Sequence, residues 1–132
     1  MTLALDTNVL VRFLVEDDVA QSARAAKLVN RAIREGDQLF VGDVVLCEVV
    51  WVLRASYRFK RAEIADVLQR LLKAAHLTFT DSAPLKRAAD AFARGDGDFA
   101  DYVIREEARV AGCDRVATFD RALLDEAHFM AP

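Results

Sequence analysis

The chain has 132 residues, of which 54% are hydrophobic and 30% are charged, and its formal net charge is −3. This length and composition suit one globular domain spanning residues 1–132, and they exclude a disordered chain or one that needs disulfides to fold. The negative charge argues against a general nucleic-acid coat protein, which is usually basic, but not against an enzyme with an acidic metal site.

The amino-terminal segment MTLALDTNVLVRFLVEDD has no basic residues before its apolar run, so a signal peptide is not expected. No segment reaches the roughly 18 uninterrupted apolar residues of a membrane span. Cys47 and Cys113 lie far apart without CxxC or Cys/His neighbours, and each lies among apolar residues. They are therefore expected to be buried free thiols rather than zinc ligands. A cytoplasmic protein is the resulting expectation.

The first part of the chain alternates short apolar runs with helical patterns. A buried strand is predicted at 2–6, ending at an acid, and a short helix at 8–15. Residues 19–35 place apolar side chains at helical spacing, which indicates an amphipathic helix that Gly36 can end. A second strand is predicted at 38–41.

The middle of the chain continues this alternation. The β-branched content of residues 44–57 suggests a strand, but their length favours a buried helix. An amphipathic helix is predicted at 61–75 and a short strand at 77–80. Asp81 or Ser82 can cap a helix that runs to about residue 94.

The last part begins with the clearest loop, Gly95-Asp96-Gly97. A helix is predicted at 98–111, a strand at 114–118 and a short helix at 120–127, and residues 128–132 can add an edge strand. Short strands that alternate with helices indicate an α/β domain with a largely parallel sheet.

Acids stand at the positions where such sheets place their sites. Asp6 closes the first strand, and Asp120 follows the strand at 114–118. Sites in open α/β sheets lie at the carboxyl ends of the strands, so these two acids converge if the strands are neighbours. Asp101 lies one turn into its helix, and Asp98, three residues earlier, faces roughly the same way.

Glu48 is the most informative single acid, because it is the only one in the apolar run VVLCEVVWVL. A charge buried alone costs several kcal/mol, so Glu48 must be paired, neutralised or bound to a metal. Crowded carboxylates suit Mg²⁺ or Mn²⁺, which prefer oxygen ligands, and no histidine is needed. A site of this kind suits phosphodiester hydrolysis.

Each acid also has a plain structural interpretation. Asp6 and Asp98 can be helix N-caps, and Asp101 can lie on a solvated face. Asp120 can be a turn residue beside Arg121, and Glu48 can pair with Arg54 or another buried arginine. The pattern of residues alone therefore reaches only a possible metal site.

Three segments resemble a known family. LALDTNVLVRFL, the helix DVVLCEVVWVL and the block DFADYVIREEARVAGCDRVATFDRAL are similar to PIN-domain proteins, and within them to the VapC-type toxins of bacterial toxin–antitoxin pairs. The resemblance covers essentially the whole chain in the same order. It implies a three-layer α/β/α domain with a central, mostly parallel sheet, whose acids hold Mg²⁺ or Mn²⁺ and cut RNA.

Carried onto this chain, the resemblance implies roles for seven residues. Asp6 and Asp101 would be the primary metal ligands, and Glu48 and Asp120 would bind a metal directly or through water. The supporting residues implied are Asn8, Asp98 and Thr118. One departure from the family pattern is Asp43-Val44, where many members have Ser or Thr, and this puts a helix-cap contact in doubt.

The implied partners are RNA, a cognate VapB-like antitoxin and a second copy of the chain. The apolar face of residues 44–57 can serve the dimer or the antitoxin, or be plain core; it consists of Val49, Trp51, Val52 and Leu53, beside Tyr57 and Phe59. The basic residues Arg54, Arg58, Lys60 and Arg61 can contact RNA phosphates, or form a solvated face. A catalytically inactive PIN-like module that binds RNA or protein is the main alternative. A third hypothesis is a different metal-dependent phosphohydrolase, such as a DNA nuclease or a small phosphatase.

Overall fold

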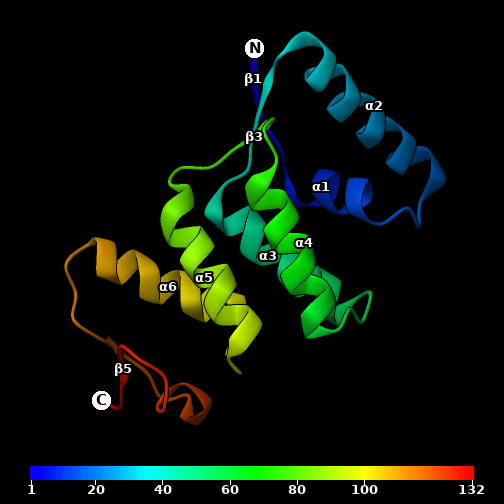
Figure 1. Ribbon diagram of the computed structural model, residues 1–132. Coiled ribbons are helices and arrows are strands. Elements are labelled where there is room, and N and C mark those ends of the chain that lie inside the picture. Colours follow the sequence, from blue (N-terminus) through cyan, green and yellow to red (C-terminus); the bar gives the residue numbers. More distant parts are fainter.

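The computed structural model describes residues 1–132 and contains six α-helices and five short strands (Figure 1). Every strand pairing is parallel. The parallel strands and the helices between them confirm the predicted α/β class, in keeping with a three-layer α/β/α domain. In chain order the elements are β1 (Thr2–Ala4), α1 (Thr7–Leu14), α2 (Val19–Glu35), β2 (Gln38–Phe40), α3 (Asp43–Ala55), α4 (Arg61–Lys73), β3 (Leu77–Thr78), α5 (Ser82–Arg94), α6 (Phe99–Val110), β4 (Val116–Ala117), the 3₁₀ turn η1 (Arg121–Leu123) and β5 (Phe129–Met130).

The helix ends follow the capping signals in the sequence. The side chain of Asp18 accepts a hydrogen bond from the backbone of Gln21 at the start of α2, and Gly36, at φ 70°, ends that helix. Asp81 caps α5 in the same way. The helix predicted at 120–127 is wrong, because only η1 forms there. Leu123 is the one buried side chain of this turn, and so short a helix gains too few backbone hydrogen bonds to be stable.

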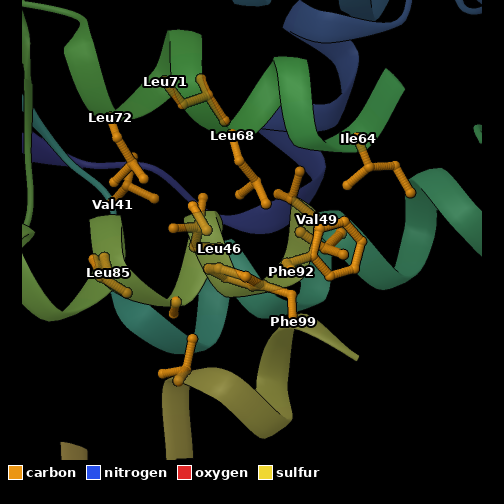
Figure 2. Packing of buried hydrophobic residues seen from close by; sticks show 14 of the residues in the cluster. Val41, Leu46, Val49, Ile64, Leu68, Leu71, Leu72, Leu85, Phe92 and Phe99 are labelled. Atoms are coloured by element: carbon orange, nitrogen blue, oxygen red, sulfur yellow. The ribbon is translucent and has the colours of Figure 1, made fainter. Parts of the chain in front are cut away.

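The hydrophobic core contains residues of all six helices, and Figure 2 shows the part of it where α3, α4, α5 and α6 meet. Leu46 of α3 and Leu68 of α4 are almost fully buried in it. Phe92 at the end of α5 and Phe99 at the start of α6 meet edge to face, with ring centroids 6.2 Å apart. This contact fixes the loop between α5 and α6, which carries the Gly95-Asp96-Gly97 sequence.

The strands form two separate sheets rather than one. The order β1-β2-β3 makes one sheet, and β4-β5 makes the other. Figure 1 shows β5 and the carboxyl terminus far from β1. The condition under which Asp6 and Asp120 would converge, that their strands are neighbours, is therefore not met within one chain.

Both cysteines are free thiols, but they differ in exposure. Cys47 is partly buried, and burial raises its pKa to about 11. Cys113 is exposed, so the prediction of a buried thiol is wrong there. It follows Gly112, whose φ of 89° ends α6 and turns the chain into solvent. No helix of this structure has both the length and the apolar character that a membrane crossing requires.

Candidate active site

The start of α6 gathers carboxylates. Asp98 is the N-cap of the helix, and its backbone N–H donates to Asp101 Oδ2 at 3.0 Å in a capping box. Burial raises the pKa of Asp101, and the negative charges of Asp98, Asp120 and Glu126 raise it further. Asp98, Asp120 and Glu126 therefore lie close enough to Asp101 to repel its negative charge, and we call these four acids the Asp101 group.

Asp120 is held by its own turn. Its Oδ1 accepts a hydrogen bond from the backbone of Ala122 at 2.9 Å, and its N–H donates to Thr118 Oγ1 at 3.0 Å. Thr118 thus orients the backbone that carries Asp120. Glu126 was not anticipated, because no motif marks it and it follows the acid Asp125 in an ordinary polar stretch.

Tyr102 and Arg61 fix the loop that precedes the Asp101 group. The Tyr102 hydroxyl accepts from the Gly97 N–H at 2.9 Å and donates to Glu126 at 2.7 Å. Arg61 donates to the carbonyl of Gly97 at 2.6 Å and lies over the Phe92 ring, 4.1 Å from its centroid. Arg61 therefore stabilises this loop, and its guanidinium group is not free to bind an RNA phosphate.

Gly97→Ala is expected to destabilise the protein by about 1–3 kcal/mol, the usual cost of overpacking. A Cβ at Gly97 would lie 2.6 Å from Leu123 Cδ2 and 3.1 Å from the Tyr102 ring. Gly42→Ala is the matched control, since its Cβ would meet only Phe40, at an ordinary 3.7 Å. Urea unfolding of both variants measures the difference. Equal free energies of unfolding for the two variants would show that the loop accommodates the added methyl group without cost.

Glu48 is exposed, which corrects the expectation of a buried charge. The buried stripe of α3 runs along its other face, so Glu48 needs no partner. Arg54, the suggested partner of Glu48, forms an ion pair with Asp98 instead. Glu48 lines a groove of about 350 Å³ between α3 and α6, together with Asp43 and Glu107.

The Asp43–Glu107 pair was also not anticipated. Burial raises the pKa of Glu107, and the neighbouring carboxylate of Asp43 raises it further. The sequence indicates only a turn or cap at Asp43, and it gives no signal that Glu107 lies beside that residue. The doubtful cap of α3 is absent as suspected, because the N-cap is Gly42 and no side chain caps the helix.

The predicted apolar face of α3 divides into two parts. Val49 and Leu53 belong to the core. Trp51 is 68% exposed and lines the same groove as Glu48, beside Ile104 of α6. The core interpretation thus holds for the first two residues, and Trp51 remains available to a partner.

Asp6 lies at the start of α1. It is the N-cap of α1, and its Oδ1 accepts from the Thr7 N–H at 2.8 Å. Asn8, two residues on, lines a groove of about 440 Å³ between α1 and α2 with Arg12 and Arg24. Asp6 therefore stands at the end of one sheet and Asp120 at the end of the other.

The chemistry of the candidate ligands fits a metal ion, but their arrangement in the chain does not. Every candidate ligand is a carboxylate, which fits Mg²⁺ or Mn²⁺. However, no group of three or more Asp, Glu, His or Cys side chains is arranged to hold a metal ion. The chain thus supplies suitable oxygens at the start of α6, without an assembled set of three ligands.

Comparison with known proteins identifies the family. Residues 3–128 match the PIN domain model, so this chain belongs to the PIN-domain family. It is also similar to the VapC ribonuclease of Aquifex aeolicus (strain VF5), with 25% identity over 118 residues, which cover 89% of this chain and 86% of that protein. Both findings confirm the resemblance seen in the sequence.

Proposed function

We propose that residues 1–132 act as one PIN domain, a metal-dependent endoribonuclease that is the toxin of a type II toxin–antitoxin pair. The observation that carries this proposal is the Asp101 group, in which like charges crowd at a helix start without a basic residue to neutralise Asp101. Membership in the PIN family and the similarity to a VapC ribonuclease support it.

The proposed ligands are the four acids of the family pattern. Asp6 and Asp101 hold Mg²⁺ or Mn²⁺ directly, and Glu48 and Asp120 bind directly or through water. The bound cation supplies an activated water and stabilises negative charge on the phosphate. Asp98 and Thr118 hold the backbone and helix start that carry Asp101 and Asp120. Asn8 follows Asp6 by two residues and orients it.

The proposed partners follow from the same assignment. The substrate is RNA, and a VapB-like antitoxin blocks the site by placing a basic side chain against the Asp101 group. The exposed apolar side chains of Trp51 and Ile104 give such a partner a surface to cover. A homodimer that acts in the cytoplasm completes the proposal.

Cleavage of total bacterial RNA by the purified protein tests the activity. Discrete fragments are expected with Mn²⁺, and EDTA is expected to abolish them, because carboxylates alone do not activate water strongly. DNA of matched length serves as the control, because cleavage of DNA would indicate a deoxyribonuclease instead. Absence of cleavage by folded protein free of antitoxin would contradict the proposal.

The alternative, an inactive module that binds RNA or protein, is favoured by one observation, the lack of an assembled metal site in one chain. Melting curves separate the two. For the enzyme, Mn²⁺ at a hundred times its dissociation constant is expected to stabilise the folded protein by about 2.7 kcal/mol. An unchanged melting temperature would favour the binding module.

A further inference from the structure

The outer face of α2 carries a row of basic residues. Arg24, Lys27, Arg31 and Arg34 are all exposed, and we call them the α2 cation stripe. Residues three or four positions apart are neighbours on a helix surface, so the four side chains lie on one side of α2. A helix rises 1.5 Å per residue, and the stripe therefore spans roughly 15 Å along the helix axis.

The α2 cation stripe has no counter-charge. None of its four residues forms an ion pair, and Glu35 is the only acid of the helix, in a chain whose net charge is −3. Like charges three or four residues apart destabilise a helix, and an ordinary solvated face avoids this cost by mixing acids with bases. The unbalanced stripe therefore suits a helix that meets a polyanion.

Arginines in other parts of the chain are used within the fold. Arg12 of α1 donates to Gln21 and to the Tyr57 hydroxyl, both at 2.8 Å. The others that bond to acids or to backbone carbonyls are Arg54, Arg61, Arg70, Arg87, Arg105 and Arg109. Arg24 lines the same groove as Arg12 but forms no ion pair, so its guanidinium group is free to bind a ligand.

The stripe begins near one of the proposed metal ligands. Arg24 and Asn8 line the groove of about 440 Å³ between α1 and α2, and Asp6, two residues before Asn8, is the N-cap of α1. Figure 1 shows α2 on the rim of the molecule, where it packs mainly on α1 and β2. A strand that leaves Asp6 through this groove therefore meets Arg24 first and the rest of the stripe afterwards.

We propose that the α2 cation stripe binds phosphates of the RNA strand on one side of the cleaved bond. The acids of the candidate site repel RNA, and a row of unpaired cations beside Asp6 offsets this repulsion and guides the strand towards the groove. Contacts to phosphates fix the position of a strand but read no bases. The stripe therefore determines how tightly the strand is held, and not which sequence is cut.

The salt dependence of RNA binding tests the stripe without reference to cleavage. Binding of a single-stranded RNA in EDTA is compared for the wild-type protein and the double variant Arg24→Gln/Arg31→Gln. Each phosphate contact adds about 0.7 to the slope of log affinity against log salt concentration for single strands, so the slope should decrease by about 1.4. Arg70→Gln/Lys73→Gln on α4 removes the same charge and should keep the wild-type slope. An equal decrease in both double variants would overturn the proposal.

Two further measurements separate binding from a purely structural role. Removal of like charges should leave the melting temperature of the Arg24→Gln/Arg31→Gln variant unchanged or raise it. Arg24→Lys/Arg31→Lys keeps both charges and should keep most of the RNA affinity, because Lys also binds phosphate as a point charge. If the Lys variant is folded and loses binding as the Gln variant does, charge does not hold the RNA and the proposal is overturned.

An acidic protein segment is the competing occupant of the stripe, and polyglutamate is the probe for it. If the Arg24→Gln/Arg31→Gln variant loses affinity for polyglutamate but keeps its affinity for RNA, the stripe serves a protein partner and the proposal is overturned. The expected result is the reverse order of effects, with the larger loss for RNA.

This inference rests on the proposed function, because it names the surface that holds the proposed substrate, but the two can fail separately. With Mn²⁺, the KM for RNA should rise in the Arg24→Gln/Arg31→Gln variant and kcat should change far less, since the lost contact is equal in the ground and transition states. Protein that cuts no RNA but binds it with a stripe-dependent salt slope would refute the ribonuclease and retain the stripe. Protein that cuts RNA, with a Gln variant that matches the α4 control in slope and KM, would overturn the stripe alone.

Discussion

Asp101→Asn is expected to abolish RNA cleavage and, at the same time, to raise the melting temperature of the metal-free protein at neutral pH. Burial and the charges of Asp98, Asp120 and Glu126 raise the pKa of Asp101, so its charged form is less favourable in the folded chain than in the unfolded one. Asn keeps an oxygen for the Asp98 N–H and carries no charge. Cleavage should fall roughly a hundredfold or more, as when one charge-stabilising group is lost.

The pH dependence identifies the cause of the stabilisation. A carboxyl with a raised folded pKa contributes stability below its unfolded pKa and loses it as pH rises through the folded pKa. The advantage of Asp101→Asn should therefore appear as pH rises above the ordinary value of 3.8. Asp96→Asn, in the exposed loop just before α6, is the control and should change neither property. A variant that cuts RNA at the normal rate would remove Asp101 from the site.

Glu106→Gln is expected to have the largest effect on stability, a loss of about 3 kcal/mol. Glu106 is fully buried and accepts from Arg87 at 2.8 Å, Arg105 at 2.9 Å and Arg109 at 3.2 Å. Gln removes the negative charge and leaves Arg105, itself buried, without its counter-ion. The loss should be measured by urea unfolding at neutral pH.

Acid should reduce this difference. Burial alone would raise the pKa of Glu106, but the hydrogen bonds from Arg87 and Arg105 and the arginine charges outweigh it and lower the pKa. A carboxyl with a lowered folded pKa stabilises above its unfolded value, here 4.5, and loses that contribution as pH falls through the folded pKa. Glu107→Gln is the adjacent control. Burial and Asp43 raise the pKa of Glu107, so this variant should not lose stability at neutral pH.

Most of the fold could be predicted from local patterns. Residues 19–35 and 82–94 form helices with those bounds, because apolar spacing and caps act within a few residues of one another. Residues 120–127 did not form the expected helix, since one buried leucine does not stabilise a helix of that length. The pairing of the last strand with β4, not with the main sheet, depends on contacts between distant segments that no local pattern encodes.

The candidate site divides in the same way. Asp98 and Asp101 lie together because helix geometry alone relates residues three positions apart. The position of Glu48 was misjudged because its helix is apolar on nearly all sides, and the sequence does not say which face meets the core. The separation of Asp6 from Asp120 follows from strand order. Glu126 joins the Asp101 group through a hydrogen bond from Tyr102, a long-range contact without a sequence signal.

The exposed position of Trp51 gives the protein a built-in optical reporter. It is the only tryptophan of the chain, and its indole lies in the groove beside Glu48. Its fluorescence in the isolated protein should resemble that of an indole in water. A partner that covers the groove should shift this emission to shorter wavelengths, so that binding can be followed in solution without attaching a label.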